Sequence, residues 1–266
     1  ANGIVRVGLV GAGGNTRLRH APGLRAQDGV EIVSVANRSR ESGERFAGEF
    51  EIPKVYDNWV DLINADDTDA ICIGTWPYMH RTLTLAALAA NKHVLCEARM
   101  AMNAKEAHDM LDASRLKPNL VTQIVPAPST LDVDATIQDM IADGYLGEIL
   151  AIKLRVSNTE GRANRNETFA DTEAPFHWRQ NQLLSGYNAM SMGIWYEQLM
   201  RYVGPASKVS AMTKVCVKQR LDENGILRSV SVPDHINVLC QMACGAQAEL
   251  SWSSVSGLQK GNELWL

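Results

Sequence analysis

Three glycines near the start of the chain are spaced as in loops that bind a phosphate group. In "VGLVGAGGNT", Gly11, Gly13 and Gly14 directly follow an apolar run and precede a helical pattern. Glycine permits a tight turn and a close approach of the backbone to a pyrophosphate, and the following helix directs its N-terminus at the negative charge. Thr16 stands where a third glycine is usual. The pattern predicts a dinucleotide site formed by Gly11, Ala12, Gly13, Gly14 and Asn15; the alternative is a tight turn without a ligand.

Two polar residues after the next apolar run bear on which cofactor is bound. That run ends in "VANRSRES", with Asn37 and Arg38 directly after it. Sites that prefer NAD usually carry Asp or Glu there, which binds the ribose 2′-hydroxyl, whereas an arginine can pair with a 2′-phosphate. We therefore predict that Asn37 and Arg38 select NADP(H), with NAD(H) as the alternative. In the contrasting interpretation, Asn37 only caps the next helix and Arg38 is a solvated surface charge.

The first half of the chain has the sequence pattern of a fold that would bring such loops close together. Short runs that are apolar at nearly every position alternate with helical segments, which indicates a parallel sheet covered on both faces, the doubly wound (Rossmann) plan. The expected strands are Ile4–Val10, Glu31–Ala36, Lys54–Tyr56, Ala70–Gly74, His93–Cys96 and Leu120–Ile124. The expected helices are Asn15–Gln27, Arg40–Glu49, Asn58–Asn64, Tyr78–Asn91 and Ala104–Arg115.

The pattern changes near Pro126 and Pro128. A helix is expected at Val133–Asp143, followed by longer alternating strands such as "ILAIKLRVS" and one helix at about Tyr187–Tyr202. This predicts an α+β domain with an open, mostly antiparallel sheet. The expected domains are residues 1–124, which bind the dinucleotide, and residues 125–266, which serve substrate and oligomer contacts. The chain stops within the strand-like "NELWL", so we expect the natural protein to continue beyond Leu266.

The composition argues against several classes of function. A net charge of −4 and a pI of about 5.9 leave no basic stripe for nucleic acid. No apolar run reaches the ~20 residues of a membrane helix, and no signal-peptide pattern is present, although a start at Ala1 without methionine leaves room for a removed leader. Five scattered cysteines without a CxxC pair indicate reduced thiols in the cytoplasm, and Cys240 and Cys244 lack the partners of a metal site, so we predict no metal.

Several stretches together resemble a known enzyme family. They are "VGLVGAGG…H", "VANRS", "DAICIGTWPYMH", "KHVLCEARMAMNAKEAHDM" and "DGYLGEI". They resemble the glucose–fructose oxidoreductase/inositol dehydrogenase family, also called Gfo/Idh/MocA, from about Val5 to Leu266. The resemblance implies a two-domain NAD(P)-dependent enzyme that oxidises or reduces a hydroxyl or carbonyl of a sugar, cyclitol or related small ring. It also implies a homodimer or homotetramer through the open sheet face, where Lys153 and Arg155 stand.

The sequence departs from the family pattern after the fifth strand. The family motif there is Glu-Lys-Pro, and its lysine hydrogen-bonds the reacting hydroxyl. Here Glu97 matches, but Ala98 replaces the lysine and Arg99 the proline. Alanine cannot donate a proton, and arginine stays protonated. The resemblance places five residues beside the cofactor, with Glu97 at the nicotinamide ribose and His80 in a more structural role: Thr75, Trp76, His80, Glu97 and Ala98.

A second departure lies in the helix of the second domain. Ser191 falls where the family has a catalytic Asp, and Trp195 where it has a catalytic His. With Asn188 they are spaced to share one helix face, which would offer the substrate no group that titrates near neutral pH. We predict that Asn188, Ser191, Trp195 and Arg179 bind substrate. Trp195 and Trp76 either form an aromatic-lined pocket for a ring substrate such as a dihydrodiol, or are ordinary core residues.

Two side chains are the expected replacements for the lost acid–base groups. His177, in "PFHWRQNQ", is predicted to be the acid/base; alternatively it is a loop histidine that bonds the backbone. Tyr187 is predicted to assist proton transfer, or else to pack against the substrate or cofactor. The leading function is an NADP(H)-dependent oxidoreductase with a non-standard proton relay. The alternatives are a catalytically silent NADP-binding sensor or partner subunit, and a lyase or glycosidase that uses transient oxidation by a tightly bound nicotinamide.

Overall fold

The computed structural model describes residues 3–126, 133–157, 174–189, 192–256 and 262–266. The chain divides into two compact units, Ala1–Pro126 and Ala127–Leu266. Each unit has its own sheet and its own hydrophobic core, so each is described by itself. No helix in these ranges is long and apolar enough to cross a membrane.

The first unit is built on a six-stranded parallel sheet in the order β3-β2-β1-β4-β5-β6. This order is the doubly wound arrangement, so the predicted fold class of this half is confirmed. All the carboxyl ends of the strands lie at one edge, where polar loops follow. The strands are β1 Val5–Val10, β2 Val30–Ala36, β3 Lys54–Tyr56, β4 Ala70–Ile73, β5 His93–Cys96 and β6 Thr122–Ile124.

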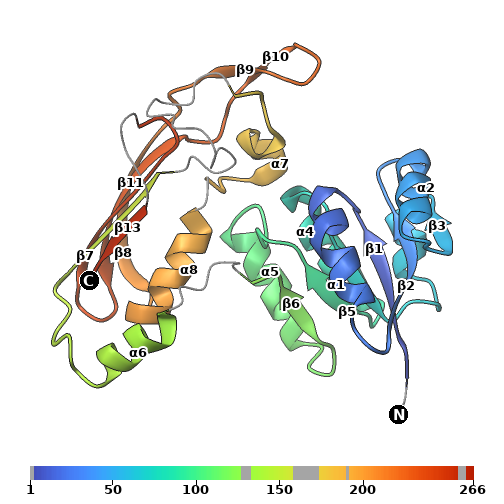
Figure 1. The fold of residues 1–266 in the computed structure, drawn as a ribbon, viewed down its shortest axis with the longest axis horizontal. Coiled ribbons are helices and arrows are strands. Elements are labelled where there is room, and N and C mark those ends of the chain that lie inside the picture. The colour runs from blue at the N-terminus through green and yellow to red at the C-terminus, as the bar shows by residue number, and fades with distance from the viewer. Residues whose placement is uncertain (1–2, 127–132, 158–173, 190–191, 257–261) are drawn as a thin grey trace. The chain divides into compact units, whose positions relative to one another are not determined.

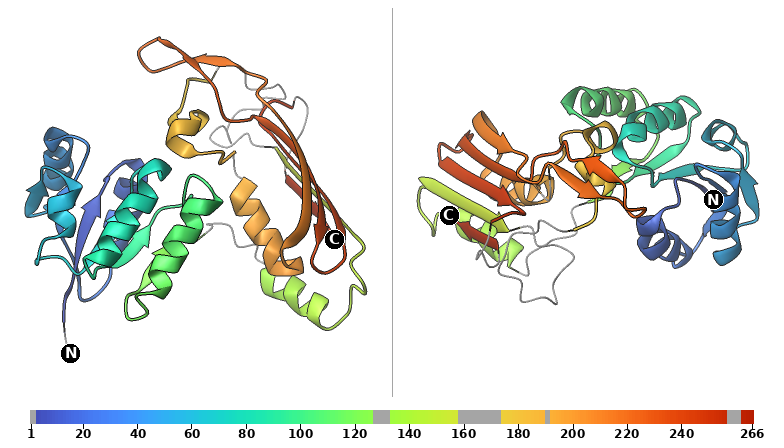
Figure 2. Two further views of the ribbon diagram at one scale, coloured as in Figure 1. Left: turned by 180° about the vertical axis from the view of Figure 1, so that it is seen from behind. Right: turned by 90° about the horizontal axis from the view of Figure 1, so that it is seen from above.

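Helices cover both faces of this sheet, as Figures 1 and 2 show. One core contains Ala21, Phe46 and Ala47 from the helices that follow β1 and β2, and the other contains Leu83 and Met110 from the helices that follow β4 and β5. The sheet therefore buries apolar side chains on both faces, which explains the nearly unbroken apolar runs of its strands. The helical elements are η1 Thr16–His20, α1 Ala21–Arg25, α2 Arg40–Glu49, α3 Trp59–Ile63, α4 Pro77–Ala89 and α5 Ala104–Arg115.

The first helical segment differs from the expected single α-helix at Asn15–Gln27. It consists of a π-helical turn, η1, followed by the short helix α1. Pro22 lies at the start of α1 and has no backbone N–H, so it cannot continue the hydrogen-bond ladder of a preceding α-helix. The π-helical turn brings His20 round toward the end of β5, where it contacts Glu97.

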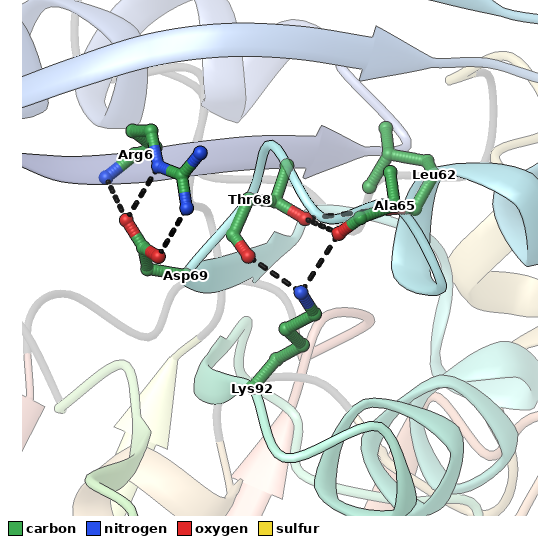
Figure 3. A network of polar contacts seen from close by, with 6 residues as sticks. All are labelled: Arg6, Leu62, Ala65, Thr68, Asp69 and Lys92. Atoms are coloured by element: carbon green, nitrogen blue, oxygen red, sulfur yellow. Dashed lines mark hydrogen bonds and ion pairs between the residues drawn. The ribbon is translucent and has the colours of Figure 1, made fainter.

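Polar contacts fasten the amino-terminal edge of this sheet (Figure 3). Asp69 accepts hydrogen bonds from the backbone N–H and the guanidinium of Arg6 at 2.8 to 3.0 Å. Lys92 donates to the carbonyl oxygens of Ala65 and Thr68 at 2.8 and 2.6 Å. These bonds tie the loop before β4 to β1 and to the segment before β5, so the strands that carry the opposite, polar edge keep their alignment.

The second unit has a five-stranded sheet in the order β13-β7-β12-β11-β8. Only β12 and β7 run parallel among the described pairs of this sheet, so the predicted mostly antiparallel sheet is confirmed. Strands β9 and β10 form a separate antiparallel hairpin. The strands are β7 Ala151–Ser157, β8 Ala206–Lys214, β9 Gln219–Leu221, β10 Leu227–Ser229, β11 His235–Met242, β12 Gln247–Ser253 and β13 Asn262–Trp265.

Two helices, α6 Asp134–Ala142 and α8 Met192–Val203, cover one face of this sheet (Figure 1). The other face carries alternate exposed side chains such as Lys153 and Leu239. Two short elements precede α8, the 3₁₀ turn η2 Trp178–Gln180 and helix α7 Gln182–Ser185.

Candidate functional site

The loop after β1 is shaped by two different kinds of glycine. Gly11 has φ +81°, and a Cβ atom there would lie 2.5 Å from Thr75 Cγ2 and 2.8 Å from Thr75 N, so only glycine fits. Gly13 and Gly14 have no neighbour within 4 Å of an added Cβ, so their backbone faces open space. The loop therefore combines a tight turn with an accessible main chain, which is what a pyrophosphate requires.

Thr16, at the third glycine position, is buried and lies against Gly74. Its hydroxyl is 3.4 Å from the carbonyl oxygen of Gly11, and a Cβ at Gly74 would lie 2.2 Å from the same hydroxyl. A glycine after β4 therefore makes room for the threonine after β1. The close packing that the third glycine usually permits is kept by a different pair of residues.

The Asn37 side chain joins the glycine loop to α2. Its Oδ1 accepts from the backbone N–H of Ala12 at 2.7 Å, and its Nδ2 donates to the carbonyl oxygen of Ser42 at 3.2 Å. An aspartate could accept the first bond but could not donate the second. Asn37 is thus a structural residue of the loop, and the absence of an acidic residue after β2 has a local explanation.

A groove of about 560 Å³ runs along the carboxyl ends of β1, β2 and β4. Arg38 is exposed on its wall and has no ion-pair partner among the described residues, whereas Arg17 and Arg45 on the same wall pair with Glu49 and Glu41 at 2.8 and 2.6 Å. The Arg38 guanidinium is therefore available to an anionic ligand. Other lining residues are Gly11, Ala12, Gly13, Asn37, Ser39, Ser42, Trp59, Thr75, Trp76 and Met79.

His80 holds together the loops after β4 and β5. It is fully buried in α4, and its ring nitrogens lie 2.9 Å from the carbonyl oxygen of Thr75 and 2.8 Å from that of Arg99. A side chain with no exposed surface does not touch a ligand, so any contribution of His80 to cofactor binding passes through these loops. Thr75 and Trp76 themselves line the groove.

Glu97 lies at the end of β5 and is bound by two residues from the segment after β1. His20 Nε2 is 2.5 Å from Glu97 Oε1, and Asn15 Nδ2 donates to the same oxygen. Burial by itself raises the pKa of Glu97, but the hydrogen bonds from His20 and Asn15 outweigh it, so the pKa lies below the usual range. Glu97 is therefore an ionised, fixed carboxylate beside the glycine loop.

His20 was not among the residues expected to form the site. The "…H" of the first motif marks it in the sequence, but its partner lies 77 positions away on a strand two places along the sheet. Only the strand order brings the two side chains together. Ala98, the next residue, is exposed, and its methyl group cannot supply the lysine's N–H donor.

In the second unit, His177 takes part in the backbone structure of its own loop. It is exposed, its Nδ1 accepts from the N–H of Arg179 at 3.3 Å, and its own N–H donates to Gln180 Oε1 at 2.9 Å, which makes a capping box for η2. The Arg179 guanidinium lies 4.4 Å from the centre of the Trp178 ring. His177 thus bonds the backbone of its own loop, and its predicted acid/base role stays a prediction.

The helix expected at Tyr187–Tyr202 begins later. Gly186, at φ 66°, ends α7, and the Asn188 side chain donates back to Ser185 O, so Tyr187 and Asn188 lie in a turn. The prediction that Asn188 shares a helix face with Trp195 is therefore wrong. Ser191 lies outside the described residues. Tyr187 is 71% exposed and free to contact a ligand, whereas Trp195 is partly buried against the core of this unit.

The residues of the first unit fit a dinucleotide. An open glycine backbone, an arginine with no ion-pair partner among the described residues and an ionised carboxylate stand along one edge of the sheet, next to the switch in strand order between β1 and β4. Within the described parts of the chain, no group of three or more His, Cys, Asp or Glu side chains is placed to hold a metal ion.

Comparison with known proteins also indicates a dinucleotide-binding fold. Residues 5–124 match the family model described as "Oxidoreductase family, NAD-binding Rossmann fold", and residues 135–266 match the "GFO/IDH/MocA C-terminal domain". Trans-1,2-dihydrobenzene-1,2-diol dehydrogenase from Sus scrofa is 28% identical over 261 residues, which cover 96% of this chain and 68% of that protein.

Solved structures share the fold, and two of them serve as examples. The oxidoreductase domain protein from Kribbella flavida has a TM-score of 0.79 at 22% identity, covering 98% of this chain and 70% of that one. Levoglucosan dehydrogenase in complex with NADH and L-sorbose has a TM-score of 0.78 at 21% identity, again covering 98% and 70%. At these identities the likeness concerns the fold alone.

Proposed function

The chain belongs to the GFO/IDH/MocA family of oxidoreductases with an NAD-binding Rossmann fold, and we propose that it is an NADP(H)-dependent enzyme acting on a sugar-like or cyclic hydroxyl or carbonyl compound. The cofactor would exchange a hydride with the substrate carbon. Gly13 and Gly14 bind its pyrophosphate, and Glu97 orients its nicotinamide ribose.

The proposed preference for NADP(H) rests on the contacts and exposure of the two residues after β2. Asn37 is engaged by the backbone of Ala12 and Ser42, and Arg38 is exposed on the groove without an ion-pair partner among the described residues. A guanidinium binds a 2′-phosphate with two charge-assisted hydrogen bonds. Neither residue offers a carboxylate to a 2′-hydroxyl, and Asp57, which also lines the groove, is paired with Arg40 at 2.6 Å.

Binding of the two cofactors tests this preference. Arg38→Ala is expected to raise the Kd of NADP(H) about tenfold, ~1.4 kcal/mol, and to leave the Kd of NAD(H) unchanged. Arg115→Ala, which removes an exposed charge at the end of α5, is the matched control and is expected to change neither. Tighter binding of NAD(H) than of NADP(H) by the unaltered protein would contradict the proposal.

The names of similar proteins support the proposed substrate class, and their compounds test it. The trans-dihydrodiol of benzene and levoglucosan represent the two named activities. Turnover of either with a change in reduced-nicotinamide absorbance supports an oxidoreductase. Turnover of a related glycoside without that change, and without added cofactor, indicates a transient-oxidation lyase or glycosidase, and the lack of any turnover indicates a silent cofactor-binding protein.

We propose that His177 and Tyr187 serve the proton transfer that the family's lysine performs elsewhere, with Arg179, Asn188, Ser191 and Trp195 around the substrate. His177→Asn keeps a side chain that caps η2 but removes the imidazole, and Tyr187→Phe removes only a hydroxyl. Each variant is expected to lower kcat about tenfold or more, ~1.4 kcal/mol of barrier. If neither does, the assignment is wrong.

We also propose a homodimer or homotetramer through the outer face of the five-stranded sheet. A groove of about 790 Å³ crosses this face, and Leu239 and Trp265 on it are 62% and 65% exposed. Leu239→Glu is expected to give monomers in light scattering. Leu221→Glu, at a 56% exposed leucine of the β9–β10 hairpin, is the control and leaves the assembly intact.

A further inference from the structure

A largely buried histidine–carboxylate pair lies at the carboxyl end of β5. The side chains of His20 and Glu97 are only 10% and 12% exposed, and His20 Nε2 is 2.5 Å from Glu97 Oε1. Asn15 donates to the same carboxylate oxygen from the opposite end of the π-helical segment. Two donors from one segment are thus fixed on one oxygen of a carboxylate from another strand.

The position of this pair places it on the nicotinamide side of the cofactor. A doubly wound sheet has two mononucleotide-binding halves, and the proposed 2′-phosphate site at Arg38 assigns the adenosine to the half made of β1, β2 and β3. The nicotinamide then belongs to the half made of β4, β5 and β6. Glu97 directly follows β5, and its backbone N–H donates to Ile73 O at the end of β4 at 3.0 Å.

The charge of the nicotinamide ring depends on its oxidation state. The oxidised ring carries one positive charge and the reduced ring none, so a nearby carboxylate stabilises the oxidised form more strongly. Hydrogen bonds from His20 and Asn15 offset the charge of the carboxylate and hold it in place.

We propose that His20 sets how strongly Glu97 favours the oxidised over the reduced cofactor. His20 is a positioning residue, since it acts through Glu97 and not by touching the substrate. This inference rests on the proposed function, because it requires a bound nicotinamide dinucleotide. It adds a residue that controls the balance between the two redox forms.

The test is the ratio of the Kd of NADPH to the Kd of NADP⁺, measured by calorimetry at pH 8, where Glu97 is ionised. His20→Leu is expected to raise this ratio about fivefold. Glu97 loses a donor that offsets its negative charge, so it stabilises the positively charged oxidised ring more strongly. Glu97→Gln is expected to lower it. His20→Gln keeps an N–H donor and is expected to restore the ratio to within about twofold of the unaltered protein.

A double variant separates an effect of His20 through Glu97 from an unspecific effect of the substitution on the fold. In the Glu97→Gln background, His20→Leu is expected to leave the ratio unchanged, because the carboxylate through which His20 acts is gone. His108→Leu, at an exposed histidine of α5, is the control for loss of an imidazole elsewhere in the unit. If His20→Leu does not fold, Asn15→Ala removes the other donor from an exposed position and is expected to shift the ratio in the same direction.

The outcomes distinguish this inference from the proposed function. Binding of both redox forms with an unchanged ratio in His20→Leu, or in Asn15→Ala if that variant replaces it, overturns the role of His20 alone. An effect of His20→Leu that persists in the Glu97→Gln background overturns it too. An unaltered protein that binds neither NADPH nor NADP⁺ refutes the proposed function, and this inference with it.

Discussion

Replacement of Gly11 by alanine separates the two tasks of the glycine loop. The residue has φ +81°, which costs a non-glycine residue about 1 to 2 kcal/mol. The new Cβ would also lie 2.5 to 2.9 Å from three atoms of Thr75, two of them in the backbone, so β4 and its loop must shift. Such overpacking costs about 1 to 3 kcal/mol more.

The sum, about 2 to 5 kcal/mol, is expected to lower the Tm of the first unit by roughly 8 to 20 °C. Calorimetry of the whole chain measures it. Gly13→Ala is the matched control, because its Cβ would meet nothing within 4 Å. It is expected to change the stability by less than about 1 kcal/mol, yet to weaken cofactor binding, since the methyl group would occupy the open side of the loop.

A Gly11→Ala protein whose Tm lies within about 2 °C of that of the unaltered protein would refute the reasoning. The close contact of the new Cβ with Thr75 would then not lower the stability. Equal losses of stability in both variants would refute it as well. Gly13 would then be needed for the fold and not for the ligand.

Two further predictions concern side chains that hold loops in place. Asp69→Asn is expected to cost less than about 1 kcal/mol at pH 7, because Asp69 and Arg6 are 37% and 40% exposed. The hydrogen bond from Arg6 lowers the pKa of Asp69 to about 2, so its contribution is complete above about pH 4 and disappears as the pH falls through 2; urea unfolding at pH 7 and 2.5 measures this. His80→Leu removes the buried imidazole that lies between the carbonyl oxygens of Thr75 and Arg99, and it is expected to cost about 1 to 3 kcal/mol in urea unfolding, with weaker cofactor binding.

The sequence predicted the first unit closely because its signals are local. Apolar runs, the glycine loop and caps such as Asn103, which accepts from Glu106 N at 3.0 Å, act within a few residues. The helices Arg40–Glu49 and Ala104–Arg115 have the expected bounds. The first helix was mispredicted because the effect of Pro22 on a π-helical turn is not visible in hydrophobic periodicity.

The side-chain geometry of the site was less predictable, because it depends on which strands are neighbours. His20 contacts Glu97, which lies far from it in the sequence. Asn37 bonds both Ala12 and Ser42, and no sequence pattern links these three residues. The start of α8 was placed too early, because a positive φ at Gly186 and the bond from Asn188 end the preceding turn. The roles proposed for Tyr187 and His177 stay predictions.

The two bonds of Asn37 also bear on how cofactor preference could be redesigned. The residue that a protein engineer would first exchange for aspartate, to attract NAD(H), is the same residue that joins the phosphate-binding loop to α2. A single exchange would place a carboxylate against the carbonyl oxygen of Ser42 and strain the loop it is meant to serve. Selection for a new cofactor should therefore recover Asn37 changes only together with changes around Ser42, so that preference and loop shape evolve as one unit.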